Sequence, residues 1–256
     1  MGKGKLAKFA DMQAYSNVYE YPFRALQQAP CPLRGRWAED VFAAPAAPIT
    51  LELGCGKGEY ALGLAKANPR GSYIGVDIKG ARMWTGATEA LQQGIANVAF
   101  LRTEIENLPR LFAPGEVQEI WLTFSDPQMK RAQKRMTSTY FLERYRKVMK
   151  DGGVVNVKTD SNFLFTYTRH VVSVNHLPLL HCCDDVYAAP AGTLPPEVTG
   201  LQTYYENQWR GRGIPIKFIS FALPLEGALR EPEVEIPLDP YRSYNRQKRS
   251  GLETSK

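Results

Sequence analysis

Several features of exported, membrane or metal-binding proteins are missing from this chain. Its four cysteines form no C-x-x-C pattern, so we expect neither a disulfide framework nor a metal site. No apolar run approaches the roughly 20 residues that cross a bilayer. The basic N-terminus also lacks a continuous apolar core before Pro22, so we expect no signal peptide. These gaps favour a protein of the reducing cytoplasm, without a membrane partner.

Composition favours one globular domain with extensions. Hydrophobic residues make up 44% of the 256 residues, which is enough to build a core. The net charge of +6 should attract polyanions, among them nucleic acids. We divide the chain into a basic and aromatic N-terminal arm with a linker (1–48), a catalytic domain (49–225) and a basic C-terminal tail (226–256).

Short apolar runs alternate with helical stretches between Ile49 and about Leu180, which predicts β-α repeats and a mostly parallel sheet. Thr137–Met149 is the clearest amphipathic helix, and its end is marked by Gly152 and Gly153. The proline-rich residues 184–200 are expected to form a loop. The predicted strands are Thr50–Leu53, Tyr73–Val76, Val98–Leu101, Glu119–Thr123, Val154–Lys158, Leu179–Cys183 and Lys217–Leu223.

The first predicted strand leads into LELGCGKGEY, where Gly54, Gly56 and Gly58 occupy every second position. Glycines at a strand-to-helix turn let the backbone approach a ligand closely. The third glycine comes one residue too early for a dinucleotide fingerprint, and Glu52 would repel a pyrophosphate. A carboxylate there suits a ligand with a positively charged amino acid end, such as S-adenosylmethionine. The alternative is that Glu52 is a salt-bridge partner at the end of a strand.

Two further acids follow the next predicted strands. Asp77 lies about 20 residues beyond the glycine loop, where nucleotide-binding α/β folds place an acceptor for ribose hydroxyls. A carboxylate accepts two hydrogen bonds at once and so holds a cis-diol well. Glu104 follows the third strand, close to the expected adenine edge. The alternative is that Glu104 caps a helix.

The fourth and fifth strands each deliver a carboxylate to the same edge of the sheet, at Asp126 and Asp160. Cations follow Asp126 within a few positions, at Lys130, Arg131, Lys134 and Arg135. An acid that faces a base, next to cations that meet phosphates, suits a nucleic-acid substrate. A solvated helix face and a turn-forming Asp-Pro are the alternatives.

With these residues the chain resembles the tRNA (guanine-N7)-methyltransferases of the bacterial single-chain type. The resemblance covers roughly residues 49–222 and rests on five motifs in order: LELGCGKGEY, GVD, FSDPQMK, KTD and TYYE. The fourth-strand motif departs from the family pattern. Ser125 replaces a proline, Gln128 replaces a tryptophan, and the basic run lacks a histidine and is one residue shorter.

The resemblance implies an α/β fold, the Rossmann-like class I S-adenosylmethionine-dependent methyltransferase, with a mostly parallel seven-stranded sheet and helices on both faces. It implies methylation of guanine N7 in tRNA, at position 46 of the variable loop, with Asp126 as the catalytic residue. The protein would act as a monomer or a homodimer. The implied S-adenosyl-L-methionine site contains Glu52, Gly54, Gly56, Gly58, Asp77, Glu104 and Asp126. The implied tRNA-binding residues are Lys130, Asp160, Thr203 and Glu206.

Two other interpretations remain open on the sequence. One is a methyltransferase that acts on another RNA, or on a small molecule or a protein; the basic composition and the cations after Asp126 count against a small-molecule or protein substrate. The other is a relative that binds RNA but has lost catalysis. Against the second, every expected carboxylate is present.

Overall fold

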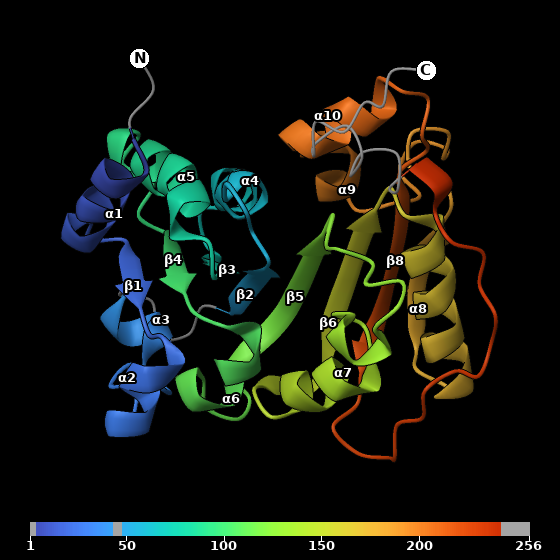
Figure 1. Ribbon diagram of the computed structural model, residues 1–256, viewed down its shortest axis with the longest axis horizontal. Coiled ribbons are helices and arrows are strands. Elements are labelled where there is room, and N and C mark those ends of the chain that lie inside the picture. The colour runs from blue at the N-terminus through green and yellow to red at the C-terminus, as the bar shows by residue number, and fades with distance from the viewer. Residues whose placement is uncertain (1–3, 43–47, 242–256) are drawn as a thin grey trace, which may run out of the picture.

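The computed structural model describes residues 4–42 and 48–241, and it is built around one central sheet (Figure 1). In these residues the sheet has eight strands in the order β1-β4-β3-β2-β5-β6-β8-β7. Only β8 runs antiparallel to its neighbours β6 and β7. The strands are β1 Val18–Glu20, β2 Ile49–Leu53, β3 Ser72–Asp77, β4 Val98–Arg102, β5 Val117–Thr123, β6 Met149–Thr159, β7 Leu179–Cys183 and β8 Lys217–Leu223.

Helices cover both faces of the sheet, which is why the central strands are apolar on both sides. Every residue of β2 is buried. One face packs against α4 and α5 and the other against α7 and α8. The helices are α1 Lys5–Ala14, α2 Phe23–Gln28, α3 Trp37–Asp40, α4 Glu59–Ala67, α5 Gly80–Gln92, α6 Leu108–Leu111, α7 Thr139–Arg146, α8 Asn162–Val174, α9 Pro196–Gly200 and α10 Tyr204–Arg210.

The N-terminal segment is part of the core, although the sequence suggests an arm. Its strand β1 pairs in parallel with β4, and this adds an eighth strand to the seven predicted. Trp37 is fully buried and donates a 2.8 Å hydrogen bond from Nε1 to the carbonyl of Leu111. A three-residue strand is too short to show an alternating pattern, so it leaves no signal in the sequence. Residues 43–47, most of the predicted linker, lie outside the described residues.

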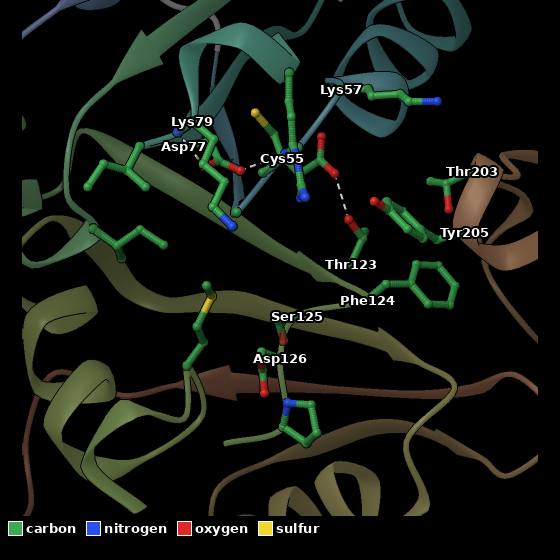
Figure 2. Close-up of a pocket in the computed structure, with 18 of the residues that line it drawn as sticks. Cys55, Lys57, Asp77, Lys79, Thr123, Phe124, Ser125, Asp126, Thr203 and Tyr205 are labelled. Carbon is green, nitrogen blue, oxygen red and sulfur yellow. Dashed lines mark hydrogen bonds between the residues drawn. The ribbon is translucent and has the colours of Figure 1, made fainter. Parts of the chain in front are cut away.

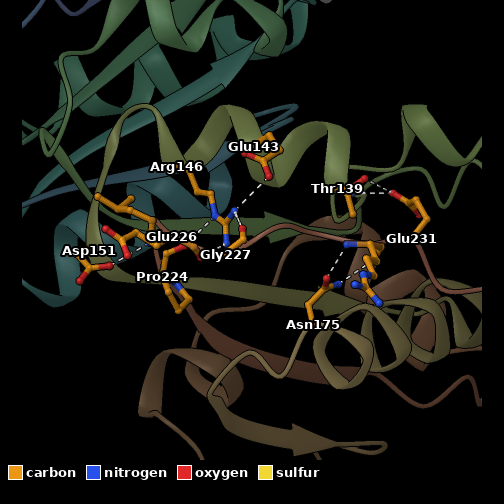
Figure 3. Close-up of polar contacts among 11 residues, drawn as sticks. Thr139, Glu143, Arg146, Asp151, Asn175, Pro224, Glu226, Gly227 and Glu231 are labelled. Carbon is orange, nitrogen blue, oxygen red and sulfur yellow. Dashed lines mark hydrogen bonds and ion pairs between the residues drawn. The ribbon is translucent and has the colours of Figure 1, made fainter.

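The C-terminal segment also differs from the predicted tail. After β8, residues 224–241 run across α7 and α8 and return to the carboxyl end of the sheet (Figures 1 and 3). Arg146 on α7 donates hydrogen bonds to the carbonyls of Pro224, Glu226 and Gly227. We call residues 224–241 the C-terminal strap. Residues 242–256 of the predicted tail lie outside the described residues.

Two boundaries need correction. The helix expected over Thr137–Met149 ends at Arg146, because Met149 already begins β6, where it pairs with Val117 of β5. The expected loop at 184–200 contains the short helix α9. In the part of the chain that is described, no helix is long and apolar enough to cross a membrane.

Candidate functional site

An open cavity of about 880 Å³ lies at the carboxyl ends of β2, β3, β4 and β5 (Figure 2). This is where open α/β sheets bind their ligands, and the volume falls in the usual range of ligand pockets, roughly 300–1,000 Å³. Asp77 and Lys79 line one side, Asp126 lies opposite, and Thr203 and Tyr205 close a third side. With Asp160 after β6, the cavity therefore gathers residues from the ends of five strands and from the segment before β8.

The glycine loop between β2 and α4 forms the upper wall of this cavity. Gly54, Gly56 and Gly58 all adopt left-handed backbone torsions, with φ of 75°, 58° and 74°. A side chain at Gly58 would also place its Cβ 2.3 Å from Phe100. The glycine pattern in the sequence therefore predicts this loop, whose backbone torsions only glycine adopts without strain.

Glu52 lies beneath the glycine loop and is 2% exposed. Its carboxylate accepts hydrogen bonds from the Thr123 hydroxyl at 2.6 Å and from the Ala61 amide at 2.8 Å. Burial raises the pKa of Glu52 from its usual 4.5 to about 7, with smaller contributions from the charges of Asp77 and Glu59. A cationic ligand group in the cavity would favour the ionised carboxylate.

Asp77 ends β3 and ties the glycine loop to the sheet. Its two carboxylate oxygens accept hydrogen bonds from the amides of Gly56, at 2.9 Å, and Lys79, at 2.8 Å. Each oxygen keeps a second lone pair with which it can accept a hydroxyl group. Glu104 follows β4, lines the same cavity and accepts a 2.9 Å hydrogen bond from Asn107. The two acids therefore line one cavity, and their contacts with a ribose and an adenine edge stay a prediction.

Asp126 is exposed in the loop that follows β5. Its Oδ1 accepts a 3.0 Å hydrogen bond from the amide of Gln128, which closes a short side-chain turn. Phe124 and Gln128, on either side, have positive φ of 50° and 45°. Non-glycine residues rarely adopt such torsions, and backbone strain of this kind concentrates at functional sites.

The four cations after Asp126 lie in different surroundings, and Arg131 is exposed and does not line the cavity. Lys130 is exposed but does not line the cavity, and Lys134 lines it and forms a 3.1 Å ion pair with Glu106. Arg135, in contrast, is only 9% exposed and donates hydrogen bonds to the carbonyls of Gln128 and Met129. The sequence predicts that all four meet phosphates; Arg135 instead supports the loop that carries Asp126.

Asp160 lies at the end of β6, lines the cavity, and is only 1% exposed. It faces the C-terminal strap: the Tyr241 hydroxyl lies 3.0 Å from its Oδ2 and 2.9 Å from its carbonyl oxygen. The side chain of Lys217 lies near enough to Asp160 for their charges to interact. The carboxylate is therefore part of the cavity wall and is held from outside by the strap.

Thr203 and Glu206 form a capping box at the start of α10, each bonding to the other's backbone amide. Thr203 lines the cavity. Glu206 is fully buried and forms a 2.7 Å ion pair with Lys158, which corrects the expectation of direct substrate contact in this conformation. Its position gives it a role in holding α10, whose Tyr205, Gln208 and Trp209 line the cavity.

Sequence reasoning missed several residues of the cavity. The cations Lys57, Lys79, Arg82 and Arg212 line it, and Tyr241 lies behind Asp160. Lys57 follows a motif glycine directly, so the loop itself carries a signal for its position. Nothing near Tyr241 in the sequence indicates a return to the site, because the contact spans 81 residues.

The arrangement suits one kind of ligand chemistry. A buried acid beneath a glycine loop can pair with an ammonium group, and a strand-end acid next to it can hold a diol. The cations around the cavity add sites for a phosphate backbone. In the described residues no cluster of histidine, cysteine and acidic side chains is arranged to bind a metal ion.

Comparisons with known proteins agree with this chemistry. A sequence family described as "Putative methyltransferase" matches residues 46–218. The chain is 58% identical to the tRNA (guanine-N(7)-)-methyltransferase of Bacteroides thetaiotaomicron over 256 residues, all of both chains. The protein of that name from Porphyromonas gingivalis is 54% identical over 242 residues, covering 93% of this chain and 98% of its own. The protein of that name from Bacillus subtilis is 33% identical over 73% of this chain and 85% of its own.

Solved structures show the same fold at low sequence identity. The 16S rRNA methyltransferase KamB matches with a TM-score of 0.53 at 16% identity, over 80% of this chain and 95% of its own. The 16S rRNA (adenine(1408)-N(1))-methyltransferase from Catenulisporales acidiphilia matches with a TM-score of 0.52 at 17% identity, over 75% and 93%. The predicted class I methyltransferase fold is confirmed, with β1 as an added edge strand.

Proposed function

The chain belongs to the tRNA (guanine-N7)-methyltransferase family, and from this premise we propose how its cavity carries out the reaction. The enzyme transfers a methyl group from S-adenosylmethionine to guanine N7 in tRNA. We assign the target to the variable-loop guanosine at position 46, as the motif resemblance implies. The observation that supports the site assignment best is the joining of Glu52, Asp77, Asp126 and Asp160 around one cavity.

The residues present fit the cofactor. Glu52 supplies a buried carboxylate for the ammonium group, and the pKa near 7 that burial gives it would fall once a cation pairs with it. Asp77 would accept the ribose hydroxyls and Glu104 would meet the adenine edge. Gly54, Gly56 and Gly58 present no side chain at their positions, so the backbone there would lie against the ligand.

S-adenosylmethionine supplies a sulfonium methyl group: its carbon–sulfur bond breaks as the bond to N7 forms, and sulfur keeps the electron pair. Guanine N7 carries an in-plane lone pair and no proton, so the protein needs no strong general base. Asp126 and Asp160 would favour the positive charge that grows on the purine and accept hydrogen bonds from its N1 and amino groups. Alignment supplies most of the catalysis, at best about 7–11 kcal/mol.

Cations at the rim would bind the tRNA backbone. Lys57, Lys79, Arg82 and Arg212 line the cavity together with Lys134, and Lys130 lies exposed beside it. Phosphate contacts of this kind add affinity and position the RNA without reading its sequence. They would also help to offset the few kcal/mol needed to unstack the target base.

The deciding experiment is methyl transfer from labelled S-adenosylmethionine to unmodified tRNA transcripts, followed by digestion and identification of the labelled base. We expect N7-methylguanosine in the variable loop, and its loss from a transcript in which that guanosine is replaced by adenosine. Label at another guanosine would overturn the position. Cofactor binding with no transfer to tRNA would overturn the substrate.

A further inference from the structure

The C-terminal strap is held at its start and in its middle by the helices beside the site (Figure 3). At its start, Arg146 bonds to three strap carbonyls at 2.6 to 2.8 Å. In its middle, Glu231 accepts hydrogen bonds from the amide and hydroxyl of Thr139, both at 2.7 Å. The side chain of Asn175 donates a hydrogen bond to the carbonyl of Arg230 and accepts one from its amide. The path of the strap is therefore fixed by α7 and α8.

Near its end, the strap is anchored at the carboxyl end of β6. Asp239 is 2% exposed and accepts hydrogen bonds from the hydroxyl of Ser161 and the amide of Phe163, in the first turn of α8. Ser161 follows Asp160 directly in the chain. The strap thus fixes the backbone next to the acid that faces the cavity.

Tyr241 completes the connection. Its hydroxyl donates to the Oδ2 of Asp160 at 3.0 Å and to the carbonyl of the same residue at 2.9 Å, as a shared hydrogen bond. Its ring packs edge-on against Trp209 of α10, with centroids 5.3 Å apart. Trp209 and Asp160 both line the cavity. One tyrosine therefore touches two walls of the site from behind.

We propose that Tyr241 is a positioning residue for tRNA methylation, which orients the carboxylate of Asp160 toward the target guanine. The proposal rests on the function proposed above. The last torsion of an aspartate is broad and poorly fixed by its own backbone, so an outside donor decides where the second oxygen points. A donor that is held by both the Asp239 anchor and the ring of Trp209 is well placed to do this.

The test is a double-mutant cycle on single-turnover methylation of tRNA, with Tyr241→Phe, Asp160→Asn and the double variant. Tyr241→Phe removes the hydroxyl but keeps the ring on Trp209. We expect its rate constant for tRNA to fall about tenfold, the effect of losing one hydrogen bond to a charged group. In the Asp160→Asn background the same change should cost less than about twofold, because the charge that it orients is gone.

Tyr15→Phe is the matched control, since it removes a 2.9 Å hydrogen bond to Thr88 and neither residue lines the cavity. We expect the control to keep the wild-type rate, and Tyr241→Phe to keep the wild-type melting temperature and affinity for S-adenosylmethionine. An equal loss in both Asp160 backgrounds, or no loss in the wild-type background, would overturn the positioning role. If Asp160→Asn has no measurable rate, the result in the wild-type background decides. A wild-type enzyme that forms no N7-methylguanosine would instead overturn the function itself, and the inference with it.

Discussion

The Nζ of Lys158 lies 2.7 Å from the Oε1 of Glu206, and both side chains are completely buried. Glu206 also accepts a 2.6 Å hydrogen bond from the Tyr187 hydroxyl, and Lys158 donates one of 2.9 Å to the carbonyl of Leu201. The pair joins β6 of the central sheet to α10, which lines the cavity. Burial lowers the pKa of Lys158, while its partner's charge acts in the opposite direction.

Glu206→Gln should destabilise the protein by about 3–5 kcal/mol at neutral pH, because it leaves a buried ammonium group unpaired. Glutamine still completes the capping box, so the change removes mainly the charge. Without its partner, Lys158 would have a pKa further below its unfolded value. The folded state then binds fewer protons than the unfolded state, so the stability of the variant should recover as the pH rises toward that unfolded value. Urea unfolding at pH 6 and pH 9 measures both effects.

Lys158→Met combined with Glu206→Gln is the control for that prediction. Removing both charges should restore much of the lost stability, because no isolated ion stays buried. If the double variant is as unstable as Glu206→Gln at every pH, the destabilisation comes from lost packing and the ion pair is not its cause.

The buried motif strands explain why so much of the site is predictable from sequence. Glu52, Asp77, Asp126 and Asp160 each end, or lie close to the end of, a short apolar run, and parallel strands bring their carboxyl ends to one edge. The order of the runs along the chain is therefore enough to place the acids together.

The features that sequence reasoning misses depend on distant contacts. The TYYE motif assigns Glu206 to the substrate, but its environment comes from Lys158, 48 residues earlier. Arg135 resembles its exposed neighbours in a basic run, yet its guanidinium lies over the rings of Phe163 and Tyr167. Burial of a charged side chain is decided by such partners, which carry no local pattern.

Alanine variants at Gly56 and Gly58 distinguish the cost of a left-handed backbone torsion from the cost of a steric clash. Gly56→Ala places a Cβ in open space and should cost about 1–2 kcal/mol for its left-handed torsion alone. Gly58→Ala has the same strain and also a Cβ 2.3 Å from Phe100, so it should be clearly less stable than Gly56→Ala. Thermal unfolding of the two variants in parallel measures the difference. Equal melting temperatures would mean that the loop moves away from Phe100 at little cost.

Asp126→Asn tests the catalytic assignment while preserving the local turn. The asparagine oxygen can still accept the hydrogen bond from the Gln128 amide, so the loop should keep its shape. We expect the variant still to bind S-adenosylmethionine and its turnover number to fall by roughly 10²–10³, the range seen when an electrostatic contact to a transition state is lost. Asp126→Ala should lose at least as much. Near-normal turnover by either variant, with tRNA saturating, would rule out Asp126 as the catalytic residue.

The pKa of about 7 at Glu52 predicts a pH-dependent affinity for the cofactor. Because burial raises this pKa, the folded protein without ligand keeps the carboxyl protonated and neutral below about pH 7. Pairing with the ammonium group of S-adenosylmethionine requires the ionised form, so binding must release a proton there. Affinity should therefore rise between about pH 5.5 and pH 7, by up to about tenfold per unit at the acidic end of that range. Isothermal titration in two buffers of different ionisation enthalpy measures both the affinity and the released proton.

Glu52→Gln provides the control, because glutamine cannot titrate. Its Oε1 can accept from the Ala61 amide while its Nε2 donates to the Thr123 hydroxyl, so the local hydrogen bonds survive. The variant should bind S-adenosylmethionine more weakly than wild type at pH 7 and with little pH dependence up to that pH. The stability of the free proteins should change in the opposite direction: between pH 4.5 and about pH 7 wild type loses stability relative to the variant, since its folded state holds a proton that the unfolded state has released. A wild-type affinity that is flat over this range would contradict the prediction. It would show that Glu52 is already ionised in the free protein, so that its burial does not control the affinity for the cofactor.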